Sequence, residues 1–264
     1  MENYNRISRG FVLMVAFISF SMFAAPQAFA DCSLLPSHAA LSAALSSVVT
    51  AGGNGGLGNN MWATVVDRDG VVCAVTRTGA LGAQWPGSRV ISAQKANTAN
   101  AFSLPGLALS TANLYSAVQP GGSLFGLQES NPVNTAVAYA GNAADYGTAT
   151  DPMVNQKIGG VNVFGGGLGL YNSSGTLVGA IGVSGDTSCT DHIIAWKVRN
   201  ALGVDRLDVN PTAGVSPTHD DNIIFDITGS HGNFESKGGF GHPECGFGER
   251  PIAEALPKTN PVGP

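Results

Sequence analysis

Two short motifs carry the residues best suited to chemistry, and they lie far apart in the sequence. Cys189–His192 reads CTDH and His242–Cys245 reads HPEC, so each motif holds one cysteine and one histidine three positions apart. Together they offer two sulfurs and two imidazoles, the ligand set of a tetrahedral zinc site. Residues i and i+3 share one face of a helix, so this spacing suits a common site. The alternative is a disulfide between Cys189 and Cys245, with the two histidines beside it.

The N-terminal residues bear on that choice because they indicate the compartment of the protein. Arg6 and Arg9 precede an apolar run, Phe11–Phe23, that is shorter than the roughly 20 residues needed to span a bilayer. Ala28–Ala30 (AFA) then has the small-x-small pattern of a cleavage site. Residues 1–30 are therefore predicted to be a secretory signal peptide, cleaved at about Ala30, and the protein to be periplasmic or secreted.

The four cysteines of an exported protein are expected to form disulfides. Cys32, Cys73, Cys189 and Cys245 allow three pairings. We favour Cys32–Cys73 and Cys189–Cys245, which would fasten each end of the chain to the core. Asp31 stands before Cys32, where a lipoprotein signal has Gly, Ala or Ser, so we expect no membrane anchor.

A second group of polar residues lies near the C-terminus. His219, Asp220, Asp221 and His231 have side chains that can bind divalent transition metals. Their spacing matches no defined metal site. A solvated tail is the stronger interpretation of this segment.

The composition excludes several classes of function. The 264 residues are 44% hydrophobic and 12% charged, compared with about 25% charged in an average soluble domain. The net charge is −5, so no basic surface is available to bind nucleic acid. The 36 Gly and 14 Pro indicate many turns, but the hydrophobic content is too high for a disordered chain.

The elements that would position the two motifs alternate between helices and β-hairpins. The periodicity of apolar residues predicts three helices, from the N-cap Ser37 to about Thr50, from Arg89 to about Phe102, and from Thr187-Ser188 to Leu202. Two hairpins are predicted, Met61–Asp67 with Val71–Arg77 and Gly160–Tyr171 with Thr176–Ser184. The order helix–hairpin–helix–hairpin–helix indicates an α+β fold, with an antiparallel sheet covered by helices.

The predicted domain organisation has three parts. The signal peptide, residues 1–30, precedes an α+β domain of residues 31–203 with an irregular insertion at about 106–160, which holds a short helix around Ala112–Val118. Residues 204–264 form a C-terminal extension rich in Pro and Gly, with one β-like run at Asn222–Ile227. Long irregular segments inside a domain are usually functional when they are ordered.

Several phrases of the α+β domain resemble those of one known family. They are WATVVD at Trp62–Asp67, SAQKANTA at Ser92–Ala99, GGV at Gly159–Val161 and VGAIGVSG at Val178–Gly185. On these phrases the sequence resembles the HbpS/GlcG-like haem-binding family, over about residues 37–203. The insertion and the extension depart from the compact pattern of that family.

The resemblance implies a fold, a ligand and an assembly. The fold is a five-stranded antiparallel sheet flanked by helices, the ligand is haem or a related tetrapyrrole, and the chains assemble into homo-oligomers. On the SAQKANTA helix, Lys95 would pair with a haem propionate, with Thr98 close by; the alternative is a lysine whose stem covers apolar surface. A Cys189–Cys245 bridge would bring His192 and His242 together, which makes one of them a candidate axial ligand of the haem iron.

Aromatic residues of the insertion allow two interpretations. Tyr115, Phe125, Tyr139, Tyr146 and Met153 could form a flat apolar slot for a porphyrin. The stronger interpretation is that they anchor the insertion on the domain.

The predicted function is therefore an exported haem-binding protein for storage, transfer or sensing, with haem as the cofactor. No acid/base pair of the protein is visible, so no catalytic residue is assigned and any chemistry would belong to the iron. Two alternatives stay open: an enzyme or accessory factor that acts on a small organic metabolite without haem, and a structural or interaction protein.

Overall fold

A four-stranded antiparallel sheet forms the centre of the protein. The computed structural model describes residues 31–209, 213–229 and 235–263, so the expected signal peptide and His231 lie outside the described residues. The strands, in the spatial order β2-β1-β5-β4, are β1 (Trp62–Asp67), β2 (Val72–Arg77), β4 (Gly167–Tyr171) and β5 (Leu177–Ser184).

The two predicted hairpins supply these four strands, so the five strands implied by the resemblance are not confirmed. The strand predicted over Gly160–Tyr171 begins only at Gly167. The residues before it pass over the start of a helix, where glycines let the chain lie too close for regular strand pairing: a Cβ on Gly165 would collide with the carbonyl oxygen of Ser188. The other strands described form two separate two-stranded sheets, β3 (Leu107–Ala108) with β6 (Ala213–Gly214) and β7 (Ile227–Thr228) with β8 (Glu235–Ser236).

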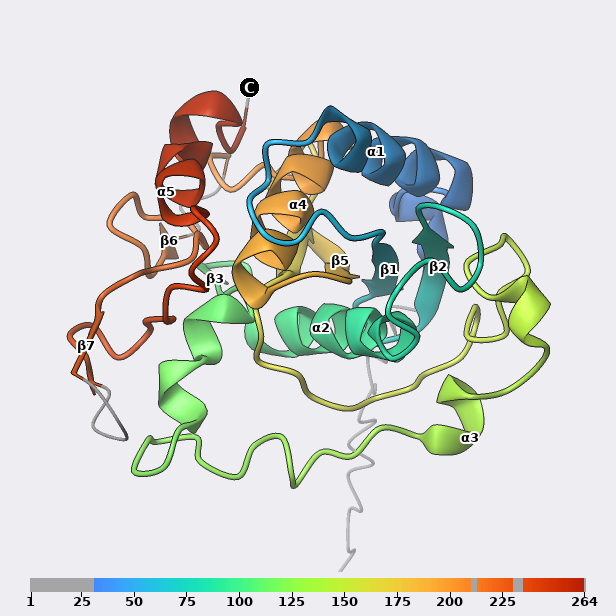
Figure 1. Cartoon of the computed structure of the whole chain (residues 1–264), viewed down its shortest axis with the longest axis horizontal. Helices are drawn as coiled ribbons and strands as arrows, with labels where there is room; N and C mark the ends of the chain where they lie inside the picture. Colours follow the sequence, from blue (N-terminus) through green and yellow to red (C-terminus); the bar gives the residue numbers. More distant parts are fainter. Residues whose placement is uncertain (1–30, 210–212, 230–234, 264) are drawn as a thin grey trace, which may run out of the picture.

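Helices cover both faces of the main sheet (Figure 1). Helix α2 (Ser88–Phe102) packs on one face, and α1 (His38–Ala51) and α4 (Ser188–Ala201) pack on the other. Every residue of β1 and β5 is buried, as expected for strands with cover on both sides. The insertion adds the short α3 (Thr135–Ala138) and the extension adds α5 (Arg250–Thr259), which the expected order lacked. None of the helices in the described ranges is long and apolar enough to cross a membrane.

The contact between β5 and α2 depends on Gly182. A Cβ at this position would collide with the carbonyl oxygen of Ser92 and would lie 2.5 Å from the amide nitrogen of Ala96. Backbone atoms in a packed helix have little freedom to move away. The glycine therefore allows the helix to approach the sheet closely.

We expect Gly182→Ala to lower the free energy of unfolding by about 1–3 kcal/mol, the range found for overpacked cores. Urea denaturation followed by circular dichroism measures the change. Gly106→Ala is the matched control, because nothing lies within 4 Å of a Cβ built there. Equal stabilities of the two variants would show that α2 can shift away from the sheet at little cost.

The insertion is held on the domain by a buried ion pair. Arg89 of α2 donates two hydrogen bonds to the carboxylate of Asp151, and both side chains are buried. The same guanidinium donates to the carbonyl of Ala138 and lies 3.6 Å from the centroid of the Tyr146 ring. Of the other residues expected to anchor or line this segment, Met153 is buried, Tyr115 is half-buried, and Phe125 and Tyr139 are exposed. Two short 3-10 turns, Ala112–Leu114 and Ser116–Val118, replace the single short helix expected there.

The expectation that the extension is a solvated tail is wrong. Asp220 and Asp221 are buried, whereas His219 is exposed. Asp221 accepts two hydrogen bonds, each of 2.7 Å, from the guanidinium of Arg199 on α4. The extension therefore completes the packing of α4, and in Figure 1 it lies beside that helix, with α5 against it. Of the strand expected at Asn222–Ile227, only Ile227 lies in a strand, as the first residue of β7.

Candidate functional site

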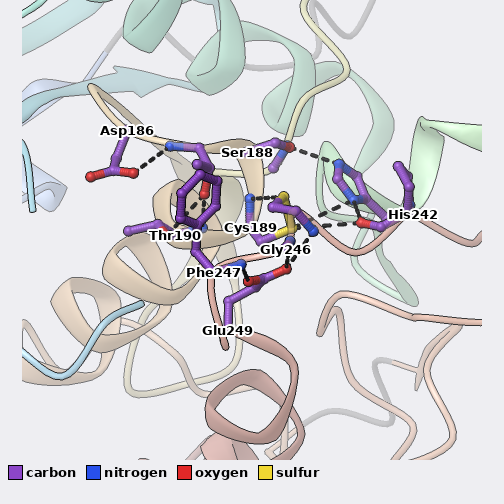
Figure 2. Close-up of a disulfide and its surroundings, with 12 residues drawn as sticks. Asp186, Ser188, Cys189, Thr190, His242, Gly246, Phe247 and Glu249 are labelled. Carbon is purple, nitrogen blue, oxygen red and sulfur yellow. Dashed lines mark hydrogen bonds between the residues drawn. A yellow bond between two sulfur atoms is a disulfide. The ribbon is translucent and has the colours of Figure 1, made fainter. Parts of the chain in front are cut away.

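The two motifs meet at the N-terminal end of α4. The Thr187 hydroxyl caps the helix by accepting the amide hydrogen of Thr190. A disulfide joins Cys189, in the first turn of α4, to Cys245 of the extension, and a second joins Cys32 to Cys73. These are the two pairs that the sequence analysis favours. Figure 2 shows the Cys189–Cys245 bond with His242 beside it.

His242 reaches this point from the extension and is 2% exposed. Its Nδ1 lies 2.7 Å from the carbonyl oxygen of Pro243, and its Nε2 lies 2.7 Å from the hydroxyl oxygen of Ser188. The ring of Tyr115 lies 4.8 Å away, centroid to centroid. Burial lowers the pKa of His242 to about 4, so the imidazole is neutral at physiological pH.

His192 lies in the second turn of α4 and is fully buried. Its Nε2 is 3.1 Å from the amide nitrogen of Ile223 and 3.2 Å from the side-chain oxygen of Asn222. Its Nδ1 is buried and has no hydrogen-bond partner among the described residues. Burial lowers the pKa of His192 to about 3, and His242 is among the groups that lower it further. The two histidines therefore share one region of the molecule, as the sequence analysis expects.

Lys95 and Thr98 are buried in α2, away from solvent. The ammonium of Lys95, which is 1% exposed, lies 2.7 Å from a carboxylate oxygen of Asp191 and 3.2 Å from the carbonyl of Val183. Burial raises the pKa of Asp191 to about 6 and lowers that of Lys95. Thr98 donates to the carbonyl of Gln94. Neither side chain is free to bind a propionate in this arrangement, and the ammonium does not extend into water as the alternative expects.

The four-ligand zinc site is not assembled. Ligand atoms of Cys189, His242 and Cys245 lie within 4.8 Å of one another, but the two sulfurs are bonded to each other and His192 is not part of the group. The other such group in the described part of the chain, Cys32, Asp67 and Cys73, also contains a disulfide.

The histidines do not form a haem site as they lie in this structure. The Nε2 of each ring is already within hydrogen-bond distance of a protein group. Two surface cavities, of about 370 and 420 Å³, have neither histidine in their walls. The smaller of these two is lined in part by Tyr115, the residue whose ring contacts His242. A porphyrin at either iron-ligating nitrogen would first have to displace part of the extension.

The residue that sequence reasoning missed is Ser188. It was expected only to begin a helix, yet its hydroxyl is the partner of His242. No local signal could have revealed the pair, because the two residues are 54 positions apart.

Comparison with known proteins places most of the chain in one family. The model of the family described as "Haem degrading protein HbpS-like" matches residues 36–199. The chain belongs to the HbpS-like family. The matched region contains Lys95, Ser188 and His192, whereas His242 and Cys245 lie in the extension beyond it. No curated protein matches the chain.

Solved structures similar to this HbpS-like chain cover about two thirds of it. The Klebsiella pneumoniae protein ORFY is 25% identical, with a TM-score of 0.43, over 63% of this chain and 90% of that one. A PduOC:heme complex is 23% identical, with a TM-score of 0.44, over 63% and 91%. A double mutant of HbpS from Streptomyces reticuli is 20% identical, with a TM-score of 0.39, over 68% and 98%.

Proposed function

We propose that this protein binds haem or a related tetrapyrrole outside the cytoplasm, for storage, transfer or sensing, as a homo-oligomer. Membership of the HbpS-like haem-degrading family, over residues 36–199, is the observation that carries the proposal. Two disulfides and the composition of residues 1–30 support the location, because disulfides persist in oxidising compartments.

His242 is the proposed ligand of first choice, with His192 as the second. Both imidazoles are neutral at physiological pH, and the neutral form binds metals. His242 lies in the segment of the extension between β8 and α5, which has no regular element, whereas His192 is part of α4 itself. Lys95 and Thr98 remain proposed as contacts to the ligand only if α2 changes its packing.

A haemin titration of the mature protein, followed by absorbance, tests the proposal. We expect a saturable one-to-one shift of the Soret band, and a loss of affinity of at least about tenfold in either His242→Ala or His192→Ala. His219→Asn is the matched control because His219 is exposed and lies outside this region. A rise in absorbance that never saturates, and is the same in all variants, would contradict haem binding. Size-exclusion chromatography of the same samples tests the oligomer.

A second candidate function, an enzyme acting on a small organic molecule without haem, is favoured by one observation. This is the hydrogen bond between Ser188 and His242, in which a hydroxyl faces a neutral, buried imidazole.

A further inference from the structure

Three groups at the start of α4 lie in the order that serine nucleophiles require. The carbonyl oxygen of Pro243 can only accept a hydrogen bond, so the nitrogen that faces it, Nδ1 of His242, carries the proton. The opposite nitrogen, Nε2, then has a free electron pair. The Ser188 hydroxyl, 2.7 Å away, donates to that pair. A nucleophile, a base and a group that orients the base thus follow one another.

The surroundings of Ser188 favour the charged form of its oxygen. The amide of Gly165 donates a hydrogen bond of 2.7 Å to Oγ. Ser188 is also the first residue of a 14-residue helix, where the helix dipole stabilises negative charge. Both interactions stabilise negative charge on Oγ as its proton passes to His242.

The base is held in one orientation. The Tyr115 ring packs against His242, and Cys245 is bonded to the residue that follows Ser188. In Figure 2 the imidazole of His242 is turned toward Ser188, beside the disulfide. Ser188 is half-buried as a residue, whereas His242 is buried.

We propose that Ser188 is a nucleophile, with His242 as its general base, for the hydrolysis of acyl esters. The Ser188 hydroxyl gives its proton to Nε2 of His242 as Oγ bonds to the carbonyl carbon of the ester. The carbon–oxygen bond to the alcohol breaks, and the departing alcohol takes the proton from His242. Water then attacks the acyl-serine, with His242 again accepting the proton. The bond between the acyl carbon and Oγ breaks, Oγ takes the proton back from His242, and the acid and the free serine are released. The net reaction is ester plus water to acid plus alcohol.

A fluorophosphonate probe tests the nucleophile in the full mature protein with its disulfides intact. The expected result is one phosphonyl group per chain, located on Ser188 by peptide mass spectrometry, with fluoride released. Ser188→Ala should abolish labelling, and His242→Gln should slow it at least about 100-fold, the lower range for loss of a general base. Ser116→Ala is the matched control: this half-buried serine of the same region donates to the carbonyl of Gly241 and has no histidine partner.

The same variants should lose hydrolysis of p-nitrophenyl acetate in parallel. Absence of labelling in the wild-type protein would overturn the proposal without any variant, as would labelling spread over several serines or unchanged in His242→Gln. In those cases the Ser188–His242 hydrogen bond serves only to hold the extension on α4. Neither assay contains haem, so the outcome leaves the proposed haem binding to its own test.

Discussion

Replacing Asp221 by Ala is expected to lower the free energy of unfolding by about 3–5 kcal/mol, the cost of breaking a buried ion pair from one side. Asp221 and its partner Arg199 are both fully buried, and two hydrogen bonds of 2.7 Å join them. The guanidinium also donates to the carbonyl of Gly169 on β4. Without the carboxylate this cation would remain in the core, because arginine does not lose its proton in proteins.

Denaturation in urea at pH 7 measures this loss. The double variant Arg199→Met with Asp221→Leu should lose clearly less than Asp221→Ala alone, because it removes both charges together. Asp208→Ala is the surface control, since Asp208 pairs with Arg206 on the exposed surface and such pairs contribute little. If Asp221→Ala were as stable as Asp208→Ala, the extension would not be packed on α4 in the way described here.

Acidification from pH 7 to pH 5 is expected to lower the free energy of unfolding by about 3 kcal/mol. His192 and His242 have folded pKa values of about 3 and about 4, below the usual 6.5. As the pH falls below 6.5 the unfolded chain therefore binds protons that the folded chain does not, and stability is lost until the folded pKa values are reached. Asp191 opposes part of this loss, because its pKa is raised to about 6 and its carboxylate takes up a proton in the folded state first.

Urea titrations at the two pH values test this dependence. His192→Gln and His242→Gln should each reduce the difference between pH 7 and pH 5 by about 2 kcal/mol, since each buried imidazole contributes about 1.4 kcal/mol per pH unit over the roughly 1.5 units below 6.5. His219→Asn should leave the difference unchanged, because that histidine is exposed. A protein equally stable at pH 5 and pH 7 would show that the two imidazoles are not buried in solution.

The elements of the α+β domain could be predicted because their signals are local. Leu41 and Leu45, four positions apart, are both buried in α1, and the Asp67–Gly70 turn joins β1 to β2. The start of β4 could not be predicted, because the glycines before it are placed by a helix that follows later in the chain. The two hairpins predicted from local patterns account for the four strands of the main sheet, whereas the count of five was implied only by the resemblance.

The candidate site likewise contains contacts that the sequence predicts and contacts that it does not. The contact between the CTDH and HPEC motifs could be predicted, because a disulfide is a long-range constraint that the cysteines themselves reveal. The structure joins the two motifs through Cys189–Cys245. The burial of Asp221 could not be foreseen, because it depends on finding Arg199 on another segment. The role of Ser188 was missed for the same reason, since a serine before a helix usually serves only as a cap.

The way the extension covers α4 has a consequence for the order of events during biosynthesis. All four strands of the main sheet and α4 are synthesised before the extension, but α4 exposes Arg199 and Trp196 until their partners arrive. One partner is Asp221, and another is the carbonyl of Asn260, which accepts the indole N–H of Trp196. A chain emerging from the ribosome therefore cannot complete the packing of α4 until Asn260 has been synthesised. Such a nascent chain exposes apolar surface for longer than a domain closed at residue 203 would.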